Sequence, residues 1–134
     1  MQAIVVVTTV GTEEQAYLIG RELVARRLAA CVNVLPGVRS IYRWQGKVCS
    51  DGELLLVIKT LEGEFEAVEQ AIKELHSYDF PEILAFPVAR GEARFLRWIE
   101  SSLDKTAPFE EDDEDGEEEA SGLGFAGLDL LADE

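Results

Sequence analysis

Two hydrophobic periods alternate along residues 2–103, and together they predict a succession of strands and helices. The apolar, β-branched run Ala3–Val10 is typical of a buried strand. After Gly11, apolar residues three and four positions apart predict a helix. The same spacing from Phe65 to about His76 predicts a second amphipathic helix.

The first predicted helix carries polar signals at both ends. Thr12 fits the N-cap position and Gln15 the third helical position, which together form a capping box. Arg26 and Arg27 fall at the expected last turn, where cations interact favourably with the helix dipole. These signals predict a helix that begins after Thr12 and ends near Arg27.

Two long strands joined by a tight turn are predicted between the helices. The first covers residues 30–35, bends at Pro36-Gly37 and continues over residues 38–44. Gln45-Gly46 predicts a tight turn, after which Lys47 begins the return strand.

The sequence of the return strand predicts both an irregularity and a deeply buried segment. Ser50-Asp51-Gly52 favours a bulge or kink. Residues 53–60 contain five consecutive apolar residues, which is typical of a strand buried on both faces.

The remaining pattern predicts one more strand and one more helix. Residues 82–88 follow Pro81 and contain Pro87 near their end. Because proline has no N–H to donate to a neighbouring strand, this strand belongs at a sheet edge. Apolar residues from Phe95 to Ile99 predict a short third helix. The order β-α-β-β-α-β plus a terminal helix predicts an α+β, ferredoxin-like fold with an antiparallel sheet and helices on one face.

The central hairpin predicts self-association. Residues 32–44 span roughly 43 Å if extended, against roughly 26 Å for Ala3–Val10, at about 3.3 Å per residue. The hairpin should therefore overhang the sheet and leave Ile41, Tyr42 and Trp44 exposed, while the sheet's other face lacks helices to cover it. We expect a homo-oligomer with cyclic symmetry, the alternative being a hairpin that folds back on its own sheet.

Composition and charge divide the 134-residue chain into one domain and a tail. Residues 1–106 contain all 12 Lys and Arg with 15 Asp and Glu, a net charge of −3. Residues 107–134 contain 12 acidic and no basic residues, which predicts a disordered acidic tail. The alternative is that the more apolar end of this tail docks a protein partner.

The charge balance also argues against two classes of partner. A nearly neutral domain with an acidic tail does not favour nucleic-acid binding or an anionic membrane surface. The sequence contains no apolar run of membrane-spanning length and no basic N-terminal signal. We therefore expect a cytoplasmic protein with both thiols reduced.

Motifs of catalysis are absent from the sequence. It contains no phosphate-binding P-loop, dinucleotide-binding glycine motif or nucleophile elbow. His76 is the only histidine, and no nucleophile–base pair can be named around it. The sequence thus predicts a protein that is not an enzyme.

Three residues are candidate metal ligands, each with a structural alternative. His76 offers a neutral imidazole, or is an ordinary histidine at a helix end. Cys31 offers a soft ligand for copper, or is a buried core thiol. Glu82 offers a carboxylate to a hard cation, pairs with an arginine, or accepts backbone N–H groups. Sequence spacing alone does not join the three, although subunit interfaces could bring them together.

Several segments resemble the CutA divalent-cation tolerance family, in order and over nearly all of residues 2–103. They are Leu28-Ala29-Ala30-Cys31-Val32-Asn33, Pro36-Gly37, Ser40-Ile41-Tyr42-Arg43-Trp44-Gln45-Gly46-Lys47, Ile58-Lys59-Thr60, Leu75-His76-Ser77-Tyr78, Pro81-Glu82-Ile83, Pro87, Gly91 and Phe95-Leu96-Arg97-Trp98-Ile99. The resemblance implies a stable homotrimer of ferredoxin-like subunits and a role in tolerance of divalent cations. The acidic tail lies outside it.

The resemblance also implies a link to copper binding, which is proposed for some members of the family. We therefore expect weak binding of copper or another divalent cation near His76, at a boundary between subunits. In a copper-binding form of the family, the ligands resemble a first-strand cysteine and a His-His pair before a Tyr-x-x-Pro-Glu segment. The corresponding positions here are Thr8 and Leu75-His76, so only His76 carries over.

Two other classes of function remain open at this stage. One is a PII-like trimeric signalling module that binds a small ligand or nucleotide between subunits. The other is a non-catalytic interaction scaffold whose acidic tail recruits a protein.

Overall fold

The computed structural model describes residues 1–108, and the predicted tail lies outside them apart from residues 107 and 108. The chain divides into two units, residues 1–104 and residues 105–134. In chain order the elements are β1 (Ala3–Val10), α1 (Glu13–Ala25), β2 (Cys31–Trp44), β3 (Lys47–Leu61), a 3-10 turn (Glu62–Glu64), α2 (Phe65–Leu75), β4 (Leu84–Pro87) and α3 (Ala93–Ser102). The predicted order of elements is therefore confirmed.

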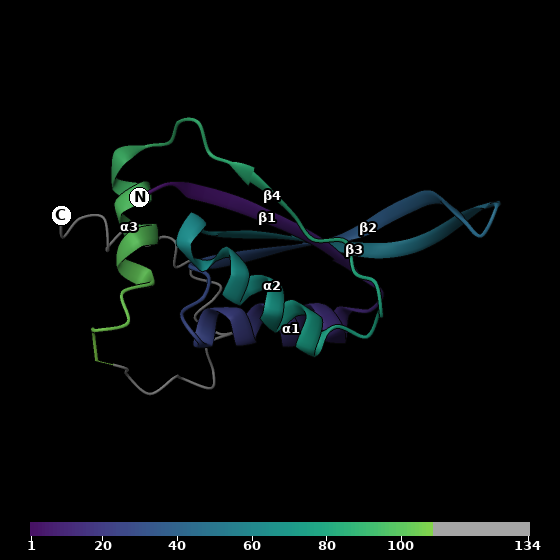
Figure 1. Cartoon of the computed structure of the whole chain (residues 1–134), viewed down its shortest axis with the longest axis horizontal. Coiled ribbons are helices and arrows are strands. Elements are labelled where there is room, and N and C mark those ends of the chain that lie inside the picture. The colour runs from purple at the N-terminus through teal and green to yellow at the C-terminus, as the bar shows by residue number, and fades with distance from the viewer. Residues whose placement is uncertain (109–134) are drawn as a thin grey trace. The chain divides into compact units, whose positions relative to one another are not determined.

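The strands form one antiparallel sheet in the order β2-β3-β1-β4 (Figure 1). β1 lies in the middle, with β3 on one side and the short β4 on the other. β4 is shorter than the predicted 82–88 because only Leu84–Pro87 pairs with β1. This is the α+β, ferredoxin-like architecture expected from the sequence.

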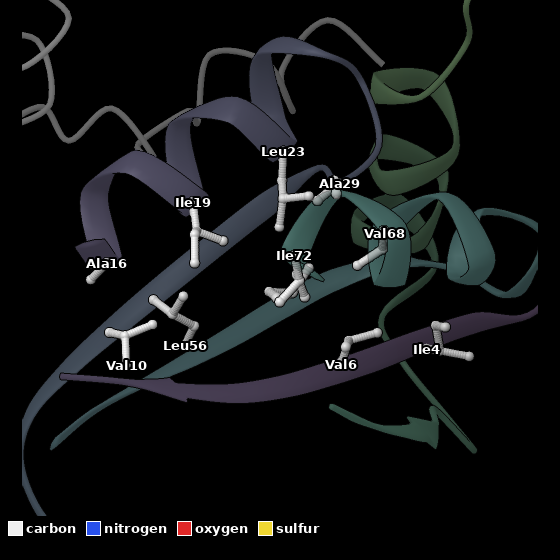
Figure 2. Packing of buried hydrophobic residues seen from close by; sticks show 12 residues of the cluster. Ile4, Val6, Val10, Ala16, Ile19, Leu23, Ala29, Leu56, Val68 and Ile72 are labelled. Atoms are coloured by element: carbon white, nitrogen blue, oxygen red, sulfur yellow. The ribbon is translucent and has the colours of Figure 1, made fainter. Parts of the chain in front are cut away.

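The hydrophobic core lies between the sheet and the helices α1 and α2 (Figure 2). Alternate residues of β1 and β3, such as Val6, Leu56 and Ile58, point to these helices and are fully buried. Ile19 of α1 and Ile72 of α2 fill the space above them. No helix of the described residues is long and apolar enough to cross a membrane.

The N-terminus of α1 is capped as predicted, but only in part. The Thr12 side chain accepts a hydrogen bond from the Gln15 backbone N–H at 3.1 Å. The Gln15 side chain does not complete the capping box, because it bonds instead to the turn after α2. Arg26 and Arg27 follow the helix rather than lying in its last turn, and Arg27 has a positive φ of 58°.

The hairpin turns where the sequence predicts, but its bulge lies elsewhere. Gln45 and Gly46 both have positive φ, as a type I′ turn requires. The predicted irregularity at Ser50-Asp51-Gly52 is wrong, because these residues pair regularly with β2. The extra residue is at Pro36-Gly37 in the facing strand, where proline donates no N–H and Gly37 adopts φ 79°.

The third helix packs at one end of the sheet. Ile99 and Leu103 form a second cluster with Ala3, Ala30 and Leu61. Ala3 and Leu61 belong to the sheet face opposite α1 and α2, since they alternate with the core residues. α3 therefore covers only an end of that face.

Candidate functional site

The middle of the sheet face opposite α1 and α2 is apolar and is not covered by a helix. Cross-strand pairing places on it residues that alternate with the core residues. We call this surface the open face; it comprises Val7, Leu35, Leu55, Val57, Leu84 and Phe86. Leu84 and Phe86 are 52% and 51% exposed. The expectation that the residue 53–60 strand is buried on both faces is therefore not met within one subunit.

The β2–β3 hairpin extends far beyond the rest of the sheet (Figure 1). β1 ends at Val10, which pairs with Leu54, so residues 47–53 of β3 pair with β2 alone. We call residues 38–53 the hairpin arm. Its unshared part is roughly 23 Å long, at about 3.3 Å for each of seven residues.

The hairpin arm exposes apolar side chains to solvent. Ile41 and Val48 are each 70% exposed. Trp44 is 49% exposed and has the Phe80 ring beside it, at a ring-centroid distance of 6.5 Å. The alternative that the arm folds back on its own sheet is wrong, because the arm continues the direction of the sheet (Figure 1).

The turn after α2 lies beside the end of β1, and its first residue, His76, is buried. His76 is 9% exposed, and its Nε2 lies 2.7 Å from the Thr9 carbonyl oxygen. Its Nδ1 accepts a hydrogen bond from the Tyr78 backbone N–H at 3.0 Å. The Gln15 amide bridges the same turn, donating to the Leu75 carbonyl at 3.0 Å and accepting from the Ser77 N–H at 2.8 Å.

The turn presents Tyr78 to the base of the hairpin arm. The Tyr78 hydroxyl donates to Glu53 Oε2 at 2.7 Å, and the Ser40 hydroxyl donates to the other Glu53 oxygen at 2.6 Å. Burial and the hydrogen bond to Glu53 raise the pKa of the Tyr78 phenol well above its ordinary value. Further along the arm, a hydrogen bond to Asp51 raises the pKa of Tyr42 to about 12.

The three predicted metal ligands do not converge within one subunit. His76 contacts Thr9 near the end of β1, and Glu82 precedes β4, whose Leu84 pairs with Val7. Cys31 is half-buried at the start of β2 and lies opposite Lys59.

The positions of Cys31 and His76 along the sheet keep them apart. Lys59, the partner of Cys31, is four residues from Leu55, the partner of Thr9, a separation of roughly 13 Å at about 3.3 Å per residue. Two ligands of one ion must each lie within about 2.3 Å of it. Across residues 1–108, no three His, Cys, Asp or Glu side chains are grouped to hold a metal ion.

Sequence reasoning missed two sets of contacts: the hydrogen bonds of Ser40 and Tyr78 to Glu53, and those of the Gln15 side chain to the turn that carries Tyr78. Their members are far apart along the chain, so no local spacing signals their meeting. The nearest local signal is the run of polar residues from 78 to 82 before the last strand, which does not indicate the partners of Tyr78.

Comparison with known proteins gives a consistent result. The family model described as CutA1 divalent ion tolerance protein matches residues 4–102. The divalent-cation tolerance protein CutA of Thermus thermophilus is 50% identical over 95 residues, which cover 71% of this chain and 92% of that protein. The chloroplastic protein CutA 1 of Oryza sativa is 41% identical over 100 residues, covering 75% of this chain but only 56% of the rice protein.

Solved structures agree with these sequence matches. The Cut A1 structure from Thermus thermophilus aligns with a TM-score of 0.72 at 49% identity, covering 72% of this chain and 94% of the other. CutA1 from Oryza sativa aligns with a TM-score of 0.76 at 39% identity, covering 78% and 96%. The family-model match over residues 4–102 spans the same part of the chain as the motifs identified in the sequence.

Proposed function

The chain belongs to the CutA1 divalent ion tolerance protein family, and from that premise we propose that it acts as a homotrimer. In this proposal the trimer is non-catalytic and serves the response to divalent metal ions. It binds copper or another divalent cation weakly at the boundary between subunits. The uncovered open face together with the hairpin arm is the observation that carries the proposal.

Assembly follows from what one subunit leaves exposed. Removing the contiguous apolar surface of the open face from water lowers the free energy. The hairpin arm adds unpaired strand edges and exposed aromatic residues, which favour pairing with another chain. In a cyclic trimer, each hairpin arm and each open face contacts a neighbouring subunit, and the ring closes so that no such surface is left without a partner.

Metal binding in this proposal requires more than one subunit. Cys31 and Glu82 lie toward opposite ends of β1, so they share an ion only if they come from different copies. A half-buried thiol and an exposed carboxylate form an incomplete ligand set of mixed softness, which favours weak binding. Names of the related proteins, which state divalent-cation tolerance, support this role.

The assembly is tested by sedimentation equilibrium at micromolar concentration. We expect the wild-type protein at three times the 14.8 kDa chain mass. Val57→Asp places a charge on the open face and should dissociate the trimer, whereas Val24→Asp on the exposed side of α1 should not. Ile41→Asp on the arm is a second disrupting variant in case Val57→Asp fails to fold. A wild-type mass of one chain would refute the trimer.

The metal site is tested by calorimetric titration with Cu(II) in excess Mg²⁺, which occupies the carboxylates of the acidic tail. Glu82→Gln and Cys31→Ser should each weaken binding by at least about tenfold. Glu66→Gln, on the exposed side of α2, is the matched control and should bind as wild type does. Equal affinity in all four proteins would exclude the proposed ligands.

A further inference from the structure

The hydrogen bonds of His76 occupy both ring nitrogens. Nδ1 faces the Tyr78 N–H and must accept, while Nε2 faces the Thr9 carbonyl oxygen and must donate. Only the neutral ring with its proton on Nε2 satisfies both contacts. A metal ion needs a free lone pair on the imidazole, and in this arrangement the Nδ1 lone pair is engaged and Nε2 carries hydrogen.

A metal ion on either ring nitrogen would break one of these two hydrogen bonds. His76 and Thr9 are both buried, so the Thr9 carbonyl would lose its donor where water does not readily replace it. A metal ion on Nδ1 would displace the Tyr78 N–H from its acceptor. The site therefore does not fit a metal ion in its present form.

The same ring is part of a continuous set of contacts that reaches the hairpin arm. The His76 and Tyr78 rings pack together with centroids 4.5 Å apart. Tyr78 then bonds to Glu53, the last residue of the arm before β3 meets β1. A Cβ added to Gly11 would lie 3.2 Å from the Tyr78 hydroxyl, so glycine leaves room for this side chain.

We propose that His76 is a positioning residue rather than a metal ligand, and that it holds Tyr78 against Glu53 to fix the base of the hairpin arm. Gln15 holds the same turn from the α1 side. The consequence for assembly rests on the proposed trimer, in which the direction of the arm decides whether it meets the next subunit. The assignment of His76 itself concerns a single subunit.

The metal part of the inference is tested by ¹⁵N NMR of the imidazole in the full-length protein. We expect a neutral ring protonated at Nε2, with both nitrogen signals unchanged when Zn²⁺ is added. Zn²⁺ is diamagnetic and a common partner of histidine, so binding would be visible directly. A shift or loss of either nitrogen signal at stoichiometric Zn²⁺ would overturn the inference.

The positioning part is tested by tyrosinate absorbance at pH 11. In the wild-type protein, Tyr78 should stay neutral because of its raised pKa, and Tyr78→Phe should leave the absorbance change unaltered. In His76→Ala the change should grow by one tyrosine, and the added Tyr78→Phe substitution should remove that increase. An absorbance change in His76→Ala equal to wild type would contradict positioning.

Two further variants separate this role from general stability. His76→Asn supplies a short side-chain oxygen that can accept from the Tyr78 N–H, and we expect it to keep Tyr78 neutral at pH 11. His76→Leu fills the space without an acceptor and should behave as His76→Ala does. If Asn and Leu give the same absorbance, the hydrogen bond is not responsible. A monomeric wild-type protein would refute the proposed trimer but leave these readouts valid.

Discussion

At the scale of single residues, two buried threonine hydroxyls differ in whether they form a hydrogen bond. Thr8 and Thr60 are both fully buried on the helix-covered side of the sheet. The Thr60 hydroxyl donates to the Leu28 carbonyl at 2.7 Å, whereas the Thr8 hydroxyl has no partner among the described residues. Burial without a hydrogen bond costs about 1–3 kcal/mol, so Thr8 is a local source of instability.

Replacing these two threonines by valine, which has a similar shape, should therefore give opposite results. We expect Thr8→Val to raise the free energy of unfolding by about 1 kcal/mol, since it removes the unsatisfied hydroxyl. Thr60→Val should lower it by about 1 kcal/mol, because it leaves the Leu28 carbonyl without its donor. Urea unfolding at one fixed protein concentration measures both. Destabilisation by Thr8→Val would show that its hydroxyl has a partner.

At the scale of the element, the hairpin depends on two positions with positive φ. Gly46 closes the turn at φ 80°, and Gly37 forms the bulge at φ 79°. Gly52 has no such requirement, although it also lies in the hairpin. The sequence predicts a bend at Pro36-Gly37, a turn at Gln45-Gly46 and a bulge at Ser50-Asp51-Gly52, and only the first two are confirmed. The backbone angles separate the glycines, and these angles depend on how the two strands pair.

Alanine substitutions in the hairpin should follow this distinction. Gly46→Ala should destabilise the protein by about 1 kcal/mol, because an L-residue is strained in the left-handed region. Gly52→Ala meets no atom within 4 Å and should be neutral or slightly stabilising. Thermal unfolding of the two variants at equal concentration checks the pair. Equal losses would mean that the turn tolerates a side chain at Gly46.

At the scale of the whole molecule, the folded domain and the tail have different charge. Residues 1–106 carry a net charge of −3, so like-charge repulsion between subunits is small and association of the open faces is not opposed. The 12 acidic residues beyond them account for most of the formal charge of −15. We therefore expect the domain to carry the proposed assembly and the tail to contribute colloidal stability.

Truncation after residue 106 separates these two contributions. The shortened protein should form an oligomer with the same number of chains as the full-length protein, since the open face and the hairpin arm are retained. Its isoelectric point should rise above the value of about 4.3 calculated for the whole sequence, which isoelectric focusing measures. Its solubility near the new isoelectric point should fall, which light scattering detects as aggregation. Dissociation on truncation would show that the tail takes part in assembly.

The sequence by itself determined the order of the elements, because burial imposes a period of two on strands and 3.6 on helices. It also determined the Gln45-Gly46 turn and the Thr12 cap, which depend on neighbouring residues. The CutA-like motifs were enough to indicate the family, which the family-model match confirms. Tertiary structure alone decided the rest, because it depends on contacts between distant residues. It placed the bulge, kept Cys31 away from His76, and joined His76 through Tyr78 to Glu53.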